Sequence, residues 1–209
     1  MESEQFFTKQ NVLKLVFESA LIIFSVLLAL FLNEYRGQLK DNEQKSLALQ
    51  MVEAELKFNL ETINEWRSYH DEVLKNLNHA LQSKPLKSSL FTENGLIEEA
   101  LMPKGVVQRL LDDGAWQTLK ASSVASKIDF NTIFTLSKLY KAQAKGVELT
   151  LNNILTIISS RDALEKKNQR NTLLLLRNNV KEIVAQEVFL TVMYKQALSE
   201  IARQNHDLQ

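Results

Sequence analysis

The 209-residue chain contains no cysteine, only two prolines and five glycines, and no excess of charge of either sign. Without cysteine it can form neither disulfide bonds nor thiolate metal sites, and the absence is compatible with an oxidising compartment. Few prolines and glycines leave few places for the backbone to turn, which favours a small number of long helices. Basic and acidic residues number 25 each, so no nucleic-acid partner is expected.

The motifs of common enzymes and metal sites are also missing. The sequence has no glycine-rich phosphate loop, no nucleophile elbow and no cluster of histidines or cysteines. His70 and His79 are nine residues apart, whereas two metal ligands on one helix are typically four apart. We therefore expect no enzyme activity, no cofactor and no metal, and we interpret both histidines as structural.

One long apolar run is present, near the N-terminus. Thirteen of the eighteen residues from 15 to 32 are Leu, Ile, Val or Phe. A helix rises about 1.5 Å per residue and needs about 20 residues to cross a bilayer, so this run, extended into the headgroups by Tyr35 and Arg36, predicts a membrane span. We expect a short lead at 1–14, a single-pass anchor at 15–35 and a helical domain at 36–209. Anchor positions that would contact lipid include Leu15, Leu21, Phe24, Leu28 and Leu32.

A cleaved signal peptide is the main alternative for this run. No small residues spaced for cleavage follow Phe31, and between residues 21 and 32 only Ser25 is polar, which also argues against a helix lying in the interface. We therefore predict an uncleaved signal anchor. The basic residues on its two flanks nearly balance, so the positive-inside rule does not decide the orientation; the short lead favours an external or periplasmic C-terminal domain.

Glu18 is the one ionisable residue within the run. It lies four residues after Lys14, so the two side chains can pair at headgroup level. If anchors cluster, a ring of Glu18 carboxylates near a pore entrance is the alternative, since charged groups within spans often mark a function. Because Glu18 is close to the end of the run, we favour the paired interpretation.

The next segment has the spacing of a coiled-coil seam, with apolar residues at eight of ten steps from Leu49 to Ala80. Gly37 is the one possible hinge before it, so the anchor is expected to continue into this helix, which should end near Ser83 because Pro85 follows. Asn59 and His70 are polar steps that can set register or partner number. The seam predicted to join copies of the chain comprises Leu49, Val52, Leu56, Asn59, Ile63, Trp66 and His70.

Further helices are predicted downstream, and no segment alternates as a strand would. We expect a short helix at 94–102, a turn at 108–111, a helix at 115–127, a long helix from an Asp129 cap to about Ser160, and a last helix whose seam runs from Leu173 to Ile201. Neither 149–158 nor 172–176 is long enough to span a membrane. The predicted fold is all-α, with an N-terminal transmembrane helix that continues into a coiled-coil-like helix and an antiparallel bundle.

Two further groups of residues are candidate sites. Asp112 and Asp113 could form a paired carboxylate site, but adjacent acids before Gly114 are more typical of helix caps. Two pairs of residues could line the bottom of a ligand pocket with their aromatic rings: Trp116 with Lys120, and Trp66 with Tyr69. Such aromatic residues are more commonly packed in a core.

The anchor and its flanks resemble a family of uncharacterised bacterial single-pass membrane proteins. The resemblance lies in Glu18 at the start of the span, the Asn33-Glu34-Tyr35-Arg36 run at its end, and the 115–123 segment, which is similar to an aromatic-x-x-Leu-Lys-x-Ser pattern. Phe17 and Tyr35 depart from the family's usual Gly and Trp. The resemblance implies a bacterial cytoplasmic membrane and an all-α exterior domain, and it implies no activity.

These observations favour a membrane-anchored helical interaction or sensor module. It would self-associate through the rod and bind a partner or ligand with its bundle, so its expected partners are the lipid bilayer and either further copies of the chain or another membrane protein. The alternative is an oligomeric membrane effector or channel component with Glu18 near its pore entrance.

Overall fold

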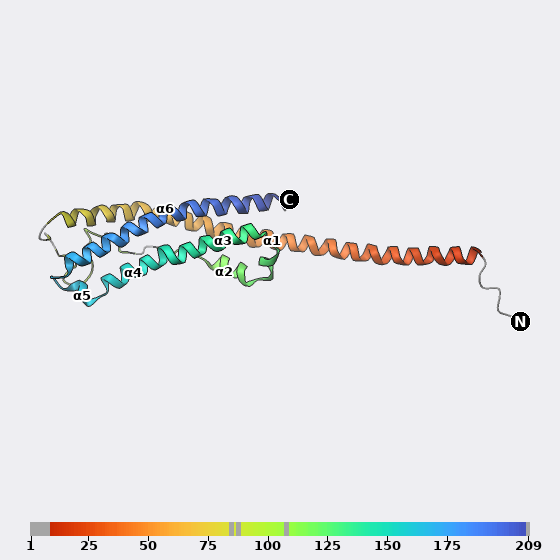
Figure 1. The fold of residues 1–209 in the computed structure, drawn as a ribbon, viewed down its shortest axis with the longest axis horizontal. Coiled ribbons are helices and arrows are strands. Elements are labelled where there is room, and N and C mark those ends of the chain that lie inside the picture. Colours follow the sequence, from red (N-terminus) through yellow and green to blue (C-terminus); the bar gives the residue numbers. More distant parts are fainter. Residues whose placement is uncertain (1–8, 84–85, 87–88, 107–108, 208–209) are drawn as a thin grey trace. The chain divides into compact units, whose positions relative to one another are not determined.

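The computed structural model describes residues 9–83, 86, 89–106 and 109–207. Among these residues the fold is all-α: there is no strand, and the only pairing of extended backbone is an isolated bridge between Phe91 and Ile97. The chain divides into two compact units, Met1–Lys45 and Ser46–Gln209. Figure 1 shows the order of the helices along the chain.

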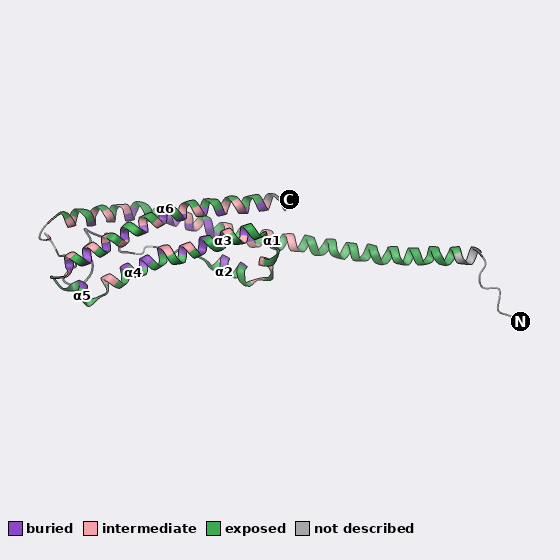
Figure 2. Cartoon of the chain, in the orientation of Figure 1, coloured by how far each residue is buried: buried purple, intermediate pink, exposed green. Residues whose placement is uncertain are grey.

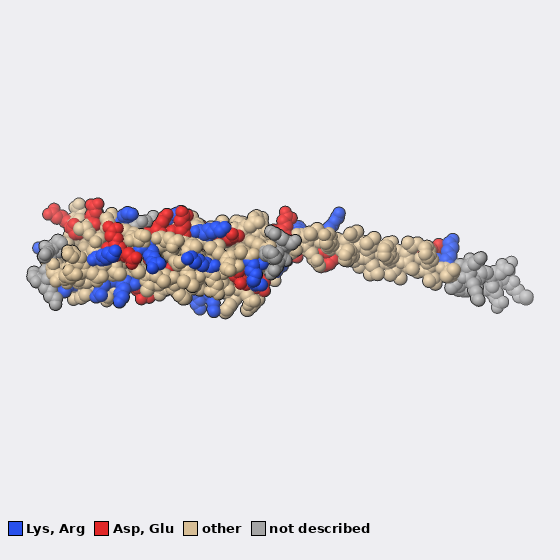
Figure 3. Space-filling model, turned by 90° about the horizontal axis from the view of Figure 1, so that it is seen from above, with Lys and Arg blue, Asp and Glu red and all other residues tan. Residues whose placement is uncertain are grey.

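The first unit consists, in its described part, of the beginning of helix α1 (Lys9–Gln82). This stretch contains a window of eighteen residues with mean hydropathy 2.6, none of which is buried, and α1 is the one described helix long and apolar enough to cross a membrane. Figure 2 shows these residues as exposed, and in Figure 3 their surface carries charged side chains only towards its two ends. Gly37 lies within α1, with open space around the position of a Cβ atom.

The second unit contains the remainder of α1 and all the later elements. These are α2 (Gly114–Ala121), the 3₁₀ helix η1 (Ser123–Lys127), α3 (Phe130–Ala142), the π-helical η2 (Gln143–Glu148), α4 (Leu149–Ile158), α5 (Arg161–Leu164) and α6 (Gln169–Asp207). Helices α3 and α4 both pack against α6, and Figure 1 shows them running in the opposite direction to it. The buried faces of the helices form one hydrophobic core.

Several local signals in the sequence act as predicted. Asp129 caps α3, because its carboxylate accepts hydrogen bonds from the backbone N–H groups of Asn131 and Thr132. Helix α1 ends at Gln82, one residue before the predicted stop; the Pro85 that predicted this stop lies outside the described residues. The guanidinium of Arg170 donates to the carbonyl oxygen of Leu81, in the last turn of α1, and to that of Ser83, the residue after the helix.

The segment from 94 to 102 is not the predicted helix. It forms turns and the isolated bridge, and Gly95 has a φ of 77°, a left-handed conformation that ends any regular helix. The backbone N–H of Thr92 donates to the carbonyl of Leu96, and that of Glu98 donates to the carbonyl of Leu90. A short hairpin-like loop therefore satisfies the backbone groups that a helix was expected to satisfy.

Three other boundaries also differ from prediction. The helix expected at 115–127 is divided, because Ser122 adopts an extended conformation between α2 and η1. The long helix expected after Asp129 contains the π-helical segment η2, and the short helix α5 follows it unpredicted. Of the turn expected at 108–111, residue 108 lies outside the described residues, and the rest is not helical.

Candidate functional site

The predicted anchor is the first candidate site, and its side chains lie on the exposed surface of α1. The five positions expected to contact lipid, Leu15, Leu21, Phe24, Leu28 and Leu32, are between 46% and 62% exposed. The ammonium of Lys14 lies 3.9 Å from Oε1 of Glu18, and both side chains are exposed. The apolar face is therefore continuous, and the single carboxylate within it has a cationic neighbour on the same helix.

The predicted seam of the rod is buried within a single copy of the chain. Its seven members are all 5% exposed or less: Leu49, Val52, Leu56, Asn59, Ile63, Trp66 and His70. Its two polar steps bond to other parts of the same chain, Asn59 to the backbone of Asp112 and His70 to Glu187. Full burial of each Leu, Ile or Val is worth about 1.5–3 kcal/mol, and in this fold that burial is supplied within the chain. The seam therefore leaves no surface on which a second copy could pack.

His70 on α1 and Glu187 on α6 form a buried polar contact between the two long helices. Nδ1 of His70 lies 2.5 Å from Oε1 of Glu187, and the Glu187 side chain is completely buried. Burial raises the pKa of Glu187 above its ordinary value, and the hydrogen bond and charge of His70 act in the opposite direction. Among the described residues, Oε2 of Glu187 has no hydrogen-bond partner. The rings of Trp66 and Tyr69 lie 6.0 and 5.5 Å from that of His70.

A second polar cluster lies where α1 meets α2 and α3, and it is organised by Glu55. The carboxylate of Glu55 accepts hydrogen bonds from the backbone N–H groups of Ala115, at 2.6 Å, and Trp116, at 3.2 Å. It also accepts one from the hydroxyl of Tyr140 at 2.5 Å. A carboxylate at the first turn of α2 satisfies N–H groups that have no partner within the helix and interacts favourably with the helix dipole.

The aspartates before α2 take a smaller part in this arrangement than their sequence suggests. Asp113 stands at the cap position, but its side chain makes no capping hydrogen bond to the backbone and instead accepts one from Gln117. The carboxylate of Asp112 accepts a hydrogen bond from the backbone N–H of Gly114. The prediction of helix caps is therefore correct for Asp112 in part and wrong for Asp113, because Glu55 occupies the capping role from another helix.

Two buried tyrosines complete the polar interior. The hydroxyl of Tyr194 donates to Oε1 of Gln143, in the π-helical segment, at 2.6 Å. Burial raises the pKa of both Tyr194 and Tyr140, and for Tyr140 the Glu55 carboxylate adds to the increase. The ring of Tyr140 stacks on that of Trp116, with centroids 5.4 Å apart. These tyrosines remain protonated at physiological pH and serve as hydrogen-bond donors within the core.

The aromatic pairs considered as ligand floors are parts of this core. Trp66, Tyr69 and Trp116 are 3–4% exposed. Lys120 lies over the outer side of the Trp116 ring, with its ammonium 6.0 Å from the centroid. The hydroxyl of Tyr69 donates to the carbonyl of Gly105 and accepts from the backbone N–H of Lys104, and burial raises its pKa.

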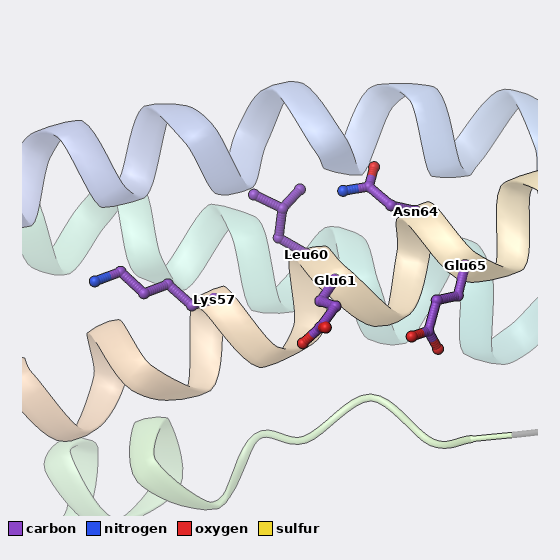
Figure 4. A pocket seen from close by; sticks show the side chains of 5 residues that line it. All are labelled: Lys57, Leu60, Glu61, Asn64 and Glu65. Atoms are coloured by element: carbon purple, nitrogen blue, oxygen red, sulfur yellow. The ribbon is translucent and has the colours of Figure 1, made fainter.

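The described surface of the second unit has hollows, of which two bear on ligand binding. One, of about 520 Å³, is open and is lined by residues of α1. Figure 4 shows that Leu60 and Asn64 point towards α6, that Glu61 and Glu65 point away from it, and that Lys57 extends along the helix. The other, of about 260 Å³, lies beside the end of α1 and includes Asn76, His79 and Leu173. The first is too open and the second is smaller than the usual ligand pocket of roughly 300–1,000 Å³.

The described residues contain no group of three or more His, Cys, Asp or Glu side chains that could hold a metal ion. His70 is buried against α6, whereas His79 is exposed beside the smaller hollow, so the two histidines have different surroundings. The sequence does not predict that the carboxylates of Glu55 and Glu187 organise the polar contacts of the interior. Glu187 interrupts an apolar seam, which was a visible signal; Glu55 gave none, because its partners lie 60 or more residues away.

Comparisons of this chain with protein-family models, with curated proteins and with solved structures found no match.

Proposed function

We propose that this protein is a single-pass, membrane-anchored interaction or sensor module, in which the helices of the second unit form an antiparallel bundle that binds a partner or ligand and associates with further copies. The observation that carries the proposal is the eighteen-residue window of mean hydropathy 2.6 in α1, none of which is buried by the chain. A soluble protein rarely exposes an apolar surface of this size, because exposing it to water is costly.

The second unit supports the same proposal because several polar groups in its interior join its own helices and loops. Glu55, Asn59 and His70 all have hydrogen-bond partners within the chain, so the polar groups of the core hold the helices together. A helical unit tethered by one span acts through its location at the membrane and through the molecules that bind to its surface. The resemblance of the anchor to bacterial single-pass proteins supports a site of action at the cytoplasmic membrane, with the second unit on the external or periplasmic side.

The channel alternative depends on Glu18 facing a pore. In the described structure the neighbour of this carboxylate is Lys14 of the same helix, one turn away, which favours a position at headgroup level. We therefore advance the anchored module alone.

The test is membrane retention of the full chain after an alkaline wash. Replacing both Phe24 and Leu28 by Arg costs about 3 kcal/mol for each charge introduced, and the favourable transfer of the two apolar side chains is lost as well. The total cost is comparable to the whole favourable insertion energy of roughly 4–8 kcal/mol. We expect the unaltered chain to stay in the membrane and the double variant to be released. Leu39→Arg, an exposed leucine beyond the predicted span, is the matched control and should be retained.

Deleting residues 15–32 tests the second half of the proposal. The shortened chain should be soluble and should keep a strongly helical circular dichroism spectrum with a cooperative unfolding transition. Release of the unaltered chain by the wash, or a largely unfolded deletion product, would contradict the anchored-module function. A reporter fused after Gln209 determines the side of the membrane, and activity of a reporter that works only in the cytoplasm would refute the external orientation.

A further inference from the structure

Helix α6 carries a second apolar stripe outside its buried seam. Val188, Phe189 and Val192 are 42%, 54% and 61% exposed, and Ala185 is also exposed. Residues three, four and seven positions apart lie on one face of a helix, so these four side chains form a continuous strip. A helix at the surface of a globular unit needs one apolar stripe, which faces the core. The second stripe of α6 is therefore apolar surface that the chain itself leaves uncovered.

The stripe has three rows when the helix is followed at the coiled-coil period of about 3.5 residues per turn. Ala185 and Val192 form the middle row. One edge consists of Lys181, Val188 and Lys195, and the other edge consists of Glu182, Phe189 and Gln196; all of these residues are exposed. Lys181 and Glu182 are adjacent in sequence, so they lie at nearly the same height along the helix. One edge therefore carries a positive charge at this height and the other edge carries a negative charge.

This arrangement is self-complementary when two copies of α6 lie parallel and in register. Opposite edges of the two stripes then meet at the same height, so Glu182 of each copy faces Lys181 of the other and Phe189 of each copy faces Val188 of the other. In an antiparallel pair, each edge meets the same edge of the other copy, and the order of the residues along it is reversed. Lys181 of one copy then faces Lys195 of the other, and like charges in that position repel. Charge therefore favours the parallel arrangement.

The structure of the second unit is compatible with two parallel copies in one membrane. His70 bonds to Glu187, and Arg170 bonds to Ser83, so residue numbers rise along α1 as they fall along α6. Ser46, where the second unit begins, therefore lies towards the C-terminal end of α6. In a parallel pair both Ser46 residues lie at the same end, as insertion of both chains into one bilayer requires.

We propose that the exposed stripe of α6 formed by Ala185, Val188, Phe189 and Val192 is a self-association surface, on which a second copy of this chain packs its own α6 in parallel register. The inference rests on the self-association included in the proposed function and names its surface. It replaces the seam of α1, which is buried within the chain. An association of this kind is isologous, so each copy supplies the same residues.

Disulfide cross-linking of the full chain in detergent micelles tests the register. The chain contains no cysteine, so each introduced thiol is the only one. Ala185→Cys and Val192→Cys are each expected to form a disulfide-linked dimer with its own counterpart, whereas Asn153→Cys, at an exposed position on α4, is not. If the two α6 variants link only to each other when mixed, the pair is antiparallel and the proposal is overturned. If neither links more than Asn153→Cys, it is overturned as well.

Substitutions in the Ala185→Cys background test the contacts themselves. Phe189→Asp is expected to reduce cross-linked dimer about tenfold, while Phe134→Asp, at a similarly exposed phenylalanine on α3, leaves it unchanged. Lys181→Glu should weaken the pair, and the exchanged variant Lys181→Glu with Glu182→Lys should restore it. Equal dimer in Phe189→Asp and Phe134→Asp, or no restoration by the exchange, would overturn the proposal.

The alkaline wash separates this inference from the membrane function. A chain that stays in the membrane but never cross-links through α6 contradicts only the association surface. A chain that is released but still cross-links contradicts only the anchor.

Discussion

His70 on α1 and Glu187 on α6 are joined by a hydrogen bond of 2.5 Å between Nδ1 and Oε1, although they are 117 residues apart in the sequence. Both belong to heptad-like seams whose neighbouring steps are apolar, such as Val73 and Leu190. A polar pair within an apolar contact fixes the register of two helices, because sliding by one turn would leave a buried carboxylate without its partner. The pair therefore specifies how α1 and α6 align.

The first prediction is that the two members of this pair are strongly coupled. His70→Leu should lower the free energy of unfolding by about 2–4 kcal/mol, because it leaves the Glu187 carboxylate buried without a partner. The double variant with Glu187→Leu should recover most of that loss, since it removes the buried carboxyl group that has lost its partner. Denaturant unfolding of the full chain in micelles, followed by circular dichroism, completes a double-mutant cycle. Additive effects of the two substitutions would show that the pair is not coupled.

The second prediction concerns pH. Burial raises the pKa of Glu187 in the folded chain above its ordinary value of 4.5, so the folded state keeps this proton over a range where the unfolded chain has lost it. The stabilisation is fully present below pH 4.5 and is lost as the pH rises through the folded-state pKa. Glu187→Gln cannot lose a proton there, so its stability relative to the unaltered chain should increase with pH.

Thermal unfolding at several pH values between 4 and 8 measures this difference. Glu61→Gln, at an exposed position on α1, is the control and should follow the unaltered chain across the range. A stability difference between Glu187→Gln and the unaltered chain that does not vary with pH would contradict the raised pKa.

The sequence predicts the long helices and their buried faces well, because both follow from periodicity. The seam residues from Leu49 to Leu77 on α1 and from Leu173 to Ile201 on α6 are buried. What periodicity cannot show is which surface covers a stripe. The spacing of the α1 seam predicts a contact between copies, whereas α6 and the loop before α2 cover it within the chain.

The features that the sequence did not reveal depend on contacts between distant segments. The loop at 89–102 replaces a predicted helix, and the backbone N–H of Leu90 donates to the side chain of Gln169, 79 residues away. The π-helical segment is not visible in the sequence pattern, because the buried positions Leu139, Gln143, Val147 and Leu151 keep a helical spacing through it. Glu55 acts as the cap of α2 only because the tertiary fold brings the two helices together.

The third prediction tests this tertiary cap. Glu55→Ala removes the acceptor for three hydrogen bonds, from the backbone of Ala115 and Trp116 and from Tyr140, and it should destabilise the chain by about 2–4 kcal/mol. Glu53→Ala breaks a pair with Lys57 that is partly exposed to solvent, and it should cost less than about 1 kcal/mol. Hydrogen exchange localises the effect, because the amides of Ala115 and Trp116 should lose protection only in Glu55→Ala. Equal losses of stability in the two variants would contradict the capping role.

The last prediction distinguishes an anchor from a channel. Glu18→Gln removes the carboxylate but keeps the size of the side chain, so a headgroup-level residue paired with Lys14 should be replaceable without loss of insertion. We expect membrane retention and α6 cross-linking to be unchanged, and potassium efflux from vesicles containing the protein to match that of the unaltered chain. Glu34→Gln, near the other end of the apolar run, is the control. If an efflux seen with the unaltered chain disappears in Glu18→Gln alone, Glu18 lies on an ion path, because neutralising a carboxylate remote from such a path does not alter conduction.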